Sequence, residues 1–485
     1  MNVPPKSRII TSCLILVLIA CIFTSLILAA GLGISLYSNM LRPATPTRAP
    51  TLTFTPRPTF TPGPTLEPRT TEQPKNPQDP AATPAPQSNT DAEMAILQSL
   101  ASQAESTRLL TALTAVPVTF ANTEQLRQRV LEDFLGDYSP EDARQDVLVL
   151  STLGLMPSDM DLLKLYEELY TEQVSGFYEP ETPEMVVRVD DALKAAEKFT
   201  YVHEYVHQLQ DQYFDIRNKL GYSEEACEGN GDRCSAVSAL IEGDATIASQ
   251  EWLKSSADFS MLKELMEYTQ ENGSSPVYDA APLFFQKDLM FPYEKGMIFV
   301  QKAFDAGGWE TVNAIYQNPP VSTEQIMHPE RYPQDKPVTV SQPDLTATLG
   351  SGWAKLEEGV LGEWMILNIL ANANDPAQRL PYNTAADAAE GWGGDFFTLY
   401  TSETGQPLLA VSSTWDTAQD TRDFAFSFNS YAVGRWGTAS AIYDYTLWKT
   451  GSQTALLYYD ENRLFTLWII GPDEASVQAA FAALR

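Results

Sequence analysis

Residues 194–213 read Lys-Ala-Ala-Glu-Lys-Phe-Thr-Tyr-Val-His-Glu-Tyr-Val-His-Gln-Leu-Gln-Asp-Gln-Tyr, and this stretch decides the fold. It contains neither glycine nor proline, and its apolar side chains recur at helical spacing. That pattern predicts a helix with one buried face. The residues expected on this face are Phe199, Val202, Val206, Leu209 and Tyr213.

Two of the chain's 3 histidines lie within this helix, at His203 and His207. On a helix, residues four apart lie on one face, about one turn from each other. Two neutral imidazoles in this arrangement can bind one Zn²⁺, and the carboxylate of Glu204 can act on a water beside the metal. Each histidine follows an apolar residue, so we expect both to be half-buried. The alternative is a pair of hydrogen-bonded core histidines with Glu204 exposed.

A tetrahedral zinc site needs a third protein ligand, and Glu242 is the best candidate. It lies in a second helical stretch, residues 238–249, next to the apolar residues Leu240 and Ile241. A carboxylate in such surroundings is costly unless it is paired or binds a metal. Gly243 lacks a side chain, which would allow another backbone to approach closely. The alternative is an ordinary surface glutamate.

The pattern His203-Glu204-x-x-His207 followed by Glu242-Gly-Asp-Ala resembles the gluzincin branch of the zincin metallopeptidases. The resemblance spans residues 160–335. It implies a helix-rich α+β domain with a small edge-strand sheet, and a zinc ion held by His203, His207 and Glu242. The sequence departs from the family pattern at Thr246, where an acidic residue is usual.

The segment Gly176-Phe-Tyr-Glu-Pro-Glu-Thr-Pro-Glu-Met-Val-Val-Arg-Val189 precedes the metal helix. Residues 181–184 are typical of a turn, and residues 185–189 are rich in strand formers. In zincins an edge strand runs above the active-site helix and pairs with extended substrate. The resemblance implies that role here, and a simple hairpin is the alternative.

The third histidine, His328, lies in Pro-Pro-Val-Ser-Thr-Glu-Gln-Ile-Met-His-Pro-Glu-Arg-Tyr, residues 319–332. Ser322 and Gln325 fit a capping box, which predicts the start of a short helix. His328 precedes a proline, which favours a loop. A loop histidine could hydrogen-bond the oxyanion of a tetrahedral intermediate, as could Tyr332. Both are therefore catalytic candidates beside Glu204, with a structural or exposed histidine as the alternative.

Residues 9–37 carry no charged side chain and are long enough to cross a bilayer. Lys6 and Arg8 precede them, so residues 1–8 are expected to be a cytoplasmic tail. The rival interpretation is a cleaved signal, including a lipoprotein signal that would leave Cys21 acylated. A transmembrane anchor is preferred because the apolar sequence continues past Cys21.

Residues 38–92 are rich in proline and threonine, which predicts a disordered, extended stalk. We therefore expect a single-pass cell-membrane protein, with the N-terminal helix in the membrane and the catalytic domain extracytoplasmic.

Cys227 and Cys234 are the only cysteines beyond the apolar segment, and they bracket a loop that a disulfide could close. Two reduced thiols are the alternative. The net charge of −31 excludes nucleic acid and anionic membrane surfaces as partners.

Two folded domains follow the stalk. Residues 93–385 are expected to form the zincin-like domain, with helices that include residues 356–371. Residues 386–485 combine strand-like runs with two helical segments, which predicts a small α+β domain.

The expected function is zinc-dependent hydrolysis of peptide bonds in a peptide or protein substrate. In this mechanism a zinc-activated water attacks the scissile carbonyl and Glu204 serves as general base. The alternative is a non-catalytic surface protein, displayed on its stalk to bind a partner, in which the histidine pair is structural.

Overall fold

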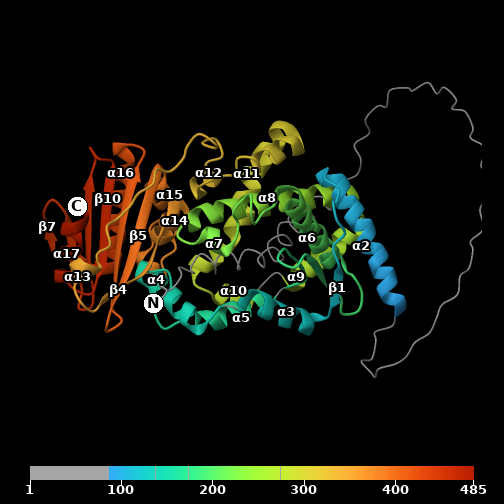
Figure 1. Ribbon diagram of the computed structural model, residues 1–485, viewed down its shortest axis with the longest axis horizontal. Helices are drawn as coiled ribbons and strands as arrows, with labels where there is room; N and C mark the ends of the chain where they lie inside the picture. Colours follow the sequence, from blue (N-terminus) through green and yellow to red (C-terminus); the bar gives the residue numbers. More distant parts are fainter. Residues whose placement is uncertain (1–86, 137, 173, 273–274) are drawn as a thin grey trace, which may run out of the picture.

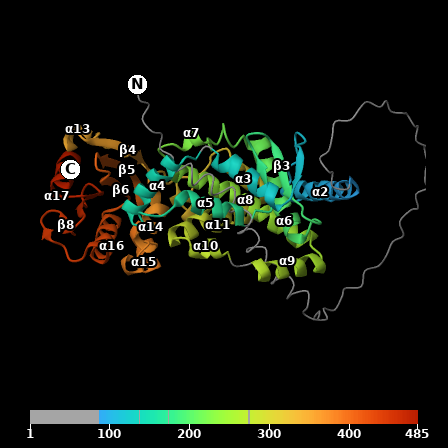
Figure 2. The same cartoon turned by 90° about the horizontal axis from the view of Figure 1, so that it is seen from below.

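The computed structural model describes residues 87–485 apart from 137, 173 and 273–274. The fold is mixed α and β, with helices gathered in one part and a seven-stranded sheet in the other. Figures 1 and 2 show that the sheet and the helix α2 (Gln87–Arg108) lie at opposite ends of an elongated molecule. The two expected zinc-binding helices lie between these ends.

The helical part begins at α2, and its first helices after α2 start at capping boxes. Asn122 and Gln125 cap α3, and Ser139 and Asp142 cap α4, so that exposed N–H groups at each helix start are satisfied. The helices up to residue 327 are α3 (Thr123–Leu135), α4 (Pro140–Leu153), α5 (Leu162–Glu172), α6 (Ala195–Phe214), α7 (Glu224–Cys227), α8 (Gly231–Ser256), α9 (Phe259–Asn272), α10 (Pro276–Ala280), α11 (Leu283–Ile315) and α12 (Thr323–Met327).

Helix α6 is the expected metal helix, and it is more deeply buried than its sequence pattern indicates. Phe199, Val202, Val206 and Leu209 are buried as expected, whereas Tyr213 is 37% exposed. The expectation of half-buried histidines is wrong, because His203 and His207 are only 1% and 3% exposed. Neighbouring elements cover α6 on several sides: α2, α8, α9 and the edge strand of a small sheet all pack against it.

Helices α8 and α11 cross at two glycines. A Cβ built on Gly243 would lie 2.3 Å from the carbonyl carbon and oxygen of Gly296, and one built on Gly296 would overlap the backbone at Ala239. The expected close backbone approach at Gly243 is therefore confirmed, and α11 is the element that makes it. This contact sets how closely α8 and α11 approach each other.

Gly243→Ala is expected to destabilise the protein by about 1–3 kcal/mol, because the added methyl must push α8 and α11 apart. Gly451→Ala is the matched control, since nothing lies within 4 Å of the position of its Cβ. Urea denaturation followed by far-UV circular dichroism measures both. Equal midpoints for the two variants would contradict this account of the crossing.

A three-stranded sheet covers one side of α6. Its strands are β1 (Val118–Ala121), β2 (Gly176–Glu179) and β3 (Glu184–Arg188), in the order β1-β3-β2. The strand-forming run at residues 185–189 is therefore the central strand, and β2 is the edge strand next to α6. The N–H of Arg188 donates to the carbonyl of Ser175, so these two residues form a hydrogen-bonded pair. Hydrogen-bonded and non-hydrogen-bonded pairs alternate along an antiparallel ladder. The backbone groups of Gly176 and Tyr178 therefore point away from β3.

The second sheet is antiparallel, in the order β4-β5-β6-β10-β9-β8-β7. Alternate residues of β10 serve two cores: Trp468 and Ile470 belong to the larger core with α16, and Leu467 and Ile469 pack with α17. Its strands are β4 (Trp353–Gly359), β5 (Trp392–Ser402), β6 (Pro407–Trp415), β7 (Ala441–Ile442), β8 (Thr446–Lys449), β9 (Thr454–Asp460) and β10 (Phe465–Gly471). The accompanying helices are α13 (Thr346–Leu349), α14 (Gly362–Ala371), η1 (Pro376–Gln378), α15 (Tyr382–Ala389), α16 (Ala418–Trp436) and α17 (Glu474–Leu484).

The expected helix at residues 356–371 is correct only in its second half. Residues 353–359 form β4, which pairs with β5, and α14 begins at Gly362, whose φ is +79°. The sheet therefore begins upstream of residue 386, where the second domain was expected to start. Pairing with β5 outweighs the weak helical pattern of this stretch.

The expectation of a single-pass membrane protein is contradicted. Throughout the part of the chain that the structure describes, no helix has both the length and the apolar character needed to span a bilayer. Residues 9–37, on which this expectation depended, lie outside the described residues, as do residues 1–8 and the stalk up to residue 86. Helix α2 begins at Gln87, inside the range assigned to the stalk.

Candidate metal centre

The three expected zinc ligands converge on one point between α6 and α8. Glu242 Oε2 lies 3.2 Å from His203 Nε2 and 3.4 Å from His207 Nε2. Two ligand atoms bound at about 2.0–2.1 Å to one tetrahedral zinc lie about 3.3 Å apart. The observed separations match this value. The ligand atom of Glu204 completes the group, since those of His203, Glu204 and His207 all lie within 4.8 Å of one another.

The ring of His207 is oriented by a side chain one turn further along α6. Its Nδ1–H donates to Gln210 Oε1 at 2.8 Å, and Gln210 Nε2 donates to the carbonyl of Ile241 at 2.9 Å. The two bonds are mutually consistent and place a proton on Nδ1, so Nε2, the atom nearest Glu242, is the one that can bind either a second proton or a metal ion. Second-layer contacts of this kind hold metal-binding histidines in one tautomer. Gln210 was not expected as a site residue, although its spacing from His207 places both on one helix face.

Glu204 is buried beside the two histidines, and only one of its two carboxylate oxygens accepts a hydrogen bond from a described residue. Its Oε2 accepts the backbone N–H of Tyr178 in β2 at 3.1 Å, whereas Oε1 is buried with no partner in the described part of the chain. A buried carboxylate oxygen without a partner is costly, so a donor such as water is expected at Oε1. Burial raises the pKa of Glu204 to about 8.

The negative charge of Glu242 is compensated by positive charge on the neighbouring histidines, and a bound cation would compensate it in the same way. Burial opposes charge on Glu242, but the charge on His207 and hydrogen bonds from both rings outweigh it and lower the pKa of Glu242 to about 2. Burial likewise opposes charge on His207, yet Glu242 raises the pKa of His207 to about 9. At His203 burial prevails and lowers the pKa. The space between the rings therefore favours a positive charge.

A second polar layer lies behind Glu242 and was not expected from the sequence. Arg108 of α2 donates from Nε and Nη2 to the two carboxylate oxygens of Asp244 at 2.7 and 2.9 Å. Tyr316 donates to Asp244 at 2.7 Å, and Asn313 accepts from Arg108 at 2.7 Å. Arg108 and Asp244 are both 0% exposed. This buried network joins α2, α8 and the end of α11 immediately beyond the Glu242 turn.

The two remaining catalytic candidates have partners of their own. His328 Nε2 lies 2.8 Å from Glu363 Oε1, and the neighbouring carboxylate raises the pKa of His328. Tyr332 donates to the carbonyl of Asn318 at 2.5 Å and packs edge-on against Phe299. Among the described residues, these contacts join neither side chain to the centre. Their catalytic roles stay predictions without geometric support.

A further acidic group, Glu324, Asp335 and Asp416, has the spacing of a metal site but surrounds a guanidinium. Arg331 Nη1 lies 2.6 Å from Glu324, 3.6 Å from Asp335 and 3.4 Å from Asp416. The Arg331 charge therefore occupies the position that a cation would take.

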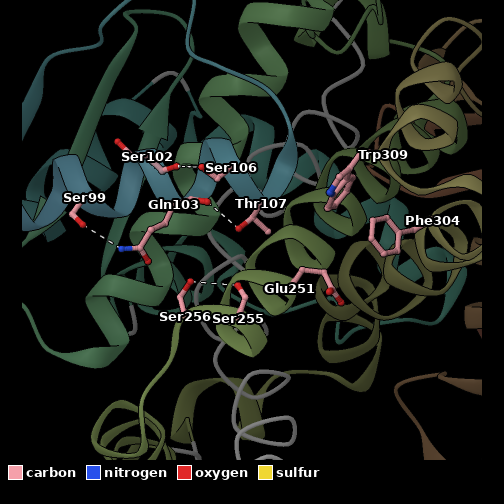
Figure 3. Close-up of a pocket in the computed structure, with 10 residues that line it drawn as sticks. All are labelled: Ser99, Ser102, Gln103, Ser106, Thr107, Glu251, Ser255, Ser256, Phe304 and Trp309. Carbon is pink, nitrogen blue, oxygen red and sulfur yellow. Dashed lines mark hydrogen bonds between the residues drawn. The ribbon is translucent and has the colours of Figure 1, made fainter. Parts of the chain in front are cut away.

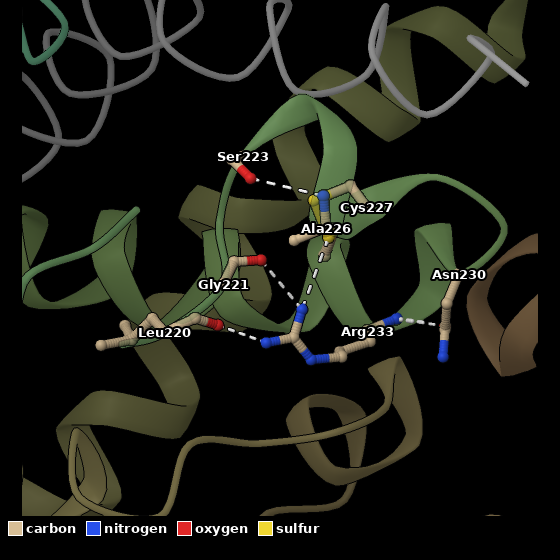
Figure 4. The surroundings of a disulfide bond; sticks show 8 residues. Leu220, Gly221, Ser223, Ala226, Cys227, Asn230 and Arg233 are labelled. Carbon is tan, nitrogen blue, oxygen red and sulfur yellow. Dashed lines mark hydrogen bonds between the residues drawn. A yellow bond between two sulfur atoms is a disulfide. The ribbon is translucent and has the colours of Figure 1, made fainter. Parts of the chain in front are cut away.

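The expected disulfide between Cys227 and Cys234 is present, with the two Cα atoms 5.7 Å apart (Figure 4). It ties α7 to the first turns of α8. Arg233 lies beside it and donates to the carbonyl groups of Leu220 and Gly221, as Figure 4 shows. The connection between α6 and α8 is thus anchored at the start of the helix that carries Glu242.

Comparison with known proteins assigns no chemistry to α6 and α8. Residues 351–480 match the family model described as a domain of unknown function, DUF8575. This match covers β4 to most of α17, and so corresponds to the seven-stranded sheet and its helices. No curated protein matches the chain, and no solved structure does.

Proposed function

We propose that this protein is a zinc metallopeptidase that hydrolyses peptide bonds at the centre between α6 and α8. The observation that carries the proposal is the convergence of His203, His207 and Glu242 at 3.2 and 3.4 Å, with Glu204 beside them. A zincin-like, gluzincin-type arrangement of a His-Glu-x-x-His helix and a downstream glutamate helix is part of the same proposal.

The donor set fits zinc. Two imidazole nitrogens and one carboxylate oxygen are ligands typical of a catalytic zinc site, which keeps a fourth position for water. A bound zinc ion supplies Lewis-acid polarisation of the scissile carbonyl and lowers the pKa of a water molecule to about 7. Gln210 holds the ring of His207 so that Nε2 faces Glu242, where the ion would lie. The carboxylate of Glu242 compensates part of the positive charge.

Glu204 acts as the proton carrier. Tyr178 N–H fixes its Oε2, so Oε1 is the atom that can accept a proton from the attacking water and return it to the leaving nitrogen.

The edge strand β2 is the element through which we propose that the substrate backbone binds; its four residues are buried, so binding there requires the covering elements to move apart. Gly176 and the carbonyl of Tyr178 face away from β3, and Tyr178 also contacts Glu204 through its N–H. An extended peptide that pairs with this edge would run directly over the general base. This is β-strand addition, in which backbone hydrogen bonds position the substrate.

Zinc content and chelator-sensitive cleavage test the proposal. Purified protein is expected to carry one zinc per chain by elemental analysis, and to cleave members of a peptide library. A chelator should abolish cleavage, and added Zn²⁺ should restore it.

His203→Ala and His207→Ala are expected to lose the metal, whereas the matched variant His328→Ala should retain it, because His328 pairs with Glu363 instead. Stoichiometric zinc without cleavage would favour a binding protein with a structural ion. Absence of zinc from the wild-type protein would exclude the metallopeptidase.

A further inference from the structure

A groove of about 630 Å³, lined by hydroxyl groups, one carboxylate and two aromatic rings, lies between α2, the end of α8 and α11 (Figure 3). Helix α2 contributes Gln103 and four hydroxyl side chains, α8 contributes Glu251 and two serines, and α11 contributes the rings of Phe304 and Trp309. Glu251 lies nine residues beyond Glu242, about 13 Å further along the same helix. None of the groups that hold the metal centre lines this groove.

The hydrogen-bond donors of the groove are largely committed within the protein. Ser102, Ser106 and Thr107 donate to carbonyl groups of α2, and Ser255 donates to the carbonyl of Trp252 in α8. Gln103 is engaged at both ends, since its amide donates to Ser99 and its oxygen accepts from the indole of Trp252. The hydroxyl oxygens can therefore serve a ligand mainly as hydrogen-bond acceptors, through their lone pairs.

Among the residues that line the groove, Glu251 is the only one with a charged side chain. Glu251 lies between Ser255 and the two rings in Figure 3, and its carboxylate pairs with Lys254 at 2.5 Å on a partly exposed surface. A carboxylate has more acceptor sites than one lysine fills. The whole chain carries a net charge of −31, which attracts cations and repels anions.

The aromatic side of the groove suits an aliphatic or cationic group. The rings of Phe304 and Trp309 lie 4.7 Å apart at 60° to each other. Arg108 already stacks on Trp309, with its guanidinium carbon 4.4 Å from the ring centroid. Aromatic faces and edges of this kind pack against the methylene stem of a lysine and attract its ammonium group.

We propose that this groove binds a primary ammonium group on an aliphatic stem, carried by a lysine side chain of a polypeptide or by a free alkylamine. The ammonium donates to Glu251 and to the serine oxygens, and the stem packs against Phe304 and Trp309. Anions are disfavoured by the lack of donors, and sugars would need donors as well as acceptors. The site does not depend on the metal centre or on peptidase activity.

Ligand-observed NMR titration of the intact protein at about 0.15 M salt tests the site, because screening at this ionic strength suppresses non-specific attraction to the acidic surface. The probes are n-butylammonium, N-acetyl-lysine methylamide and the uncharged N-acetyl-norleucine methylamide. Saturable binding is expected for the two cations, and at least tenfold weaker binding for the neutral analogue. A tenfold preference for the lysine amide identifies a polypeptide ligand, and equal binding identifies any alkylamine.

Glu251→Gln should weaken ammonium binding at least fivefold, and Thr107→Val should weaken it through loss of an acceptor. The matched control is Glu267→Gln, because Glu267 also pairs with a lysine on its own helix, at 3.1 Å. Thermal melts establish that all three variants fold. Binding that is absent in the wild type, or equal in Glu251→Gln and Glu267→Gln, would overturn the proposal.

Discussion

Glu204→Gln is expected to abolish most peptide hydrolysis while zinc stays bound. The amide keeps the size of the side chain and can still accept from Tyr178 N–H, but it cannot accept a proton at the position of Oε1. General-base catalysis contributes about 10²–10⁴-fold, so the rate should fall by that amount. The measurement is kcat/KM on the best peptide from the library, with zinc content determined on the same sample.

The comparison with His203→Ala separates catalysis from metal binding. His203→Ala should lose zinc and activity together, whereas Glu204→Gln should lose activity alone. Glu267→Gln serves as a control for removal of one negative charge at an exposed position of α9. If Glu204→Gln retained wild-type hydrolysis, the assignment of Glu204 as general base would be wrong, whatever the metal content.

Arg108→Met is expected to be the most destabilising single change proposed. It leaves the carboxylate of Asp244, which is 0% exposed, with Tyr316 as a hydrogen-bond donor but without the paired charge. Breaking a buried ion pair from one side costs about 3–5 kcal/mol. Urea denaturation should show a correspondingly lower midpoint. Arg129→Met is the matched control, because Arg129 pairs with Asp133 and Glu184 on a partly exposed surface and such pairs contribute about 0–1 kcal/mol.

The double variant Arg108→Met with Asp244→Leu distinguishes the ion pair from simple packing. Replacing both charges with apolar groups removes the uncompensated carboxylate, so most of the lost stability should return. A double variant as unstable as Arg108→Met would show that the shape of the arginine matters more than its charge. Zinc affinity of the same variants reports whether this network also positions Glu242.

The sequence identifies the residues whose side chains meet between α6 and α8. The spacing of His203 and His207 on one helix requires only helical periodicity, and Glu242 stands out because it is an acidic residue beside an apolar run. Gly243 was expected to permit a close backbone approach, and the contact with Gly296 confirms it. Each of these inferences depends on residues within about two turns of one helix.

The parts that escaped prediction depend on contacts between distant segments. Arg108 lies 136 residues before Asp244, and nothing in either local sequence indicates their pairing. The depth of burial of α6 depends on five neighbouring elements, so the pattern of α6 alone underestimates it. At residues 353–359 the partner strand β5 decides the structure, although the local pattern favours a helix. The engagement of Tyr178 N–H by Glu204 likewise requires β2 to be placed over α6.

Gln210 gives the two ligand-bearing helices a shared alignment. One amide bonds both the imidazole of His207 and the carbonyl before Glu242, so a rotation of α8 about its long axis would displace the Glu242 carboxylate and break the hydrogen bond that orients the Gln210 amide. Loss of alignment would therefore move one ligand and weaken the support of another. If the centre binds zinc as proposed, binding of the ion and docking of α8 against α6 should be thermodynamically linked.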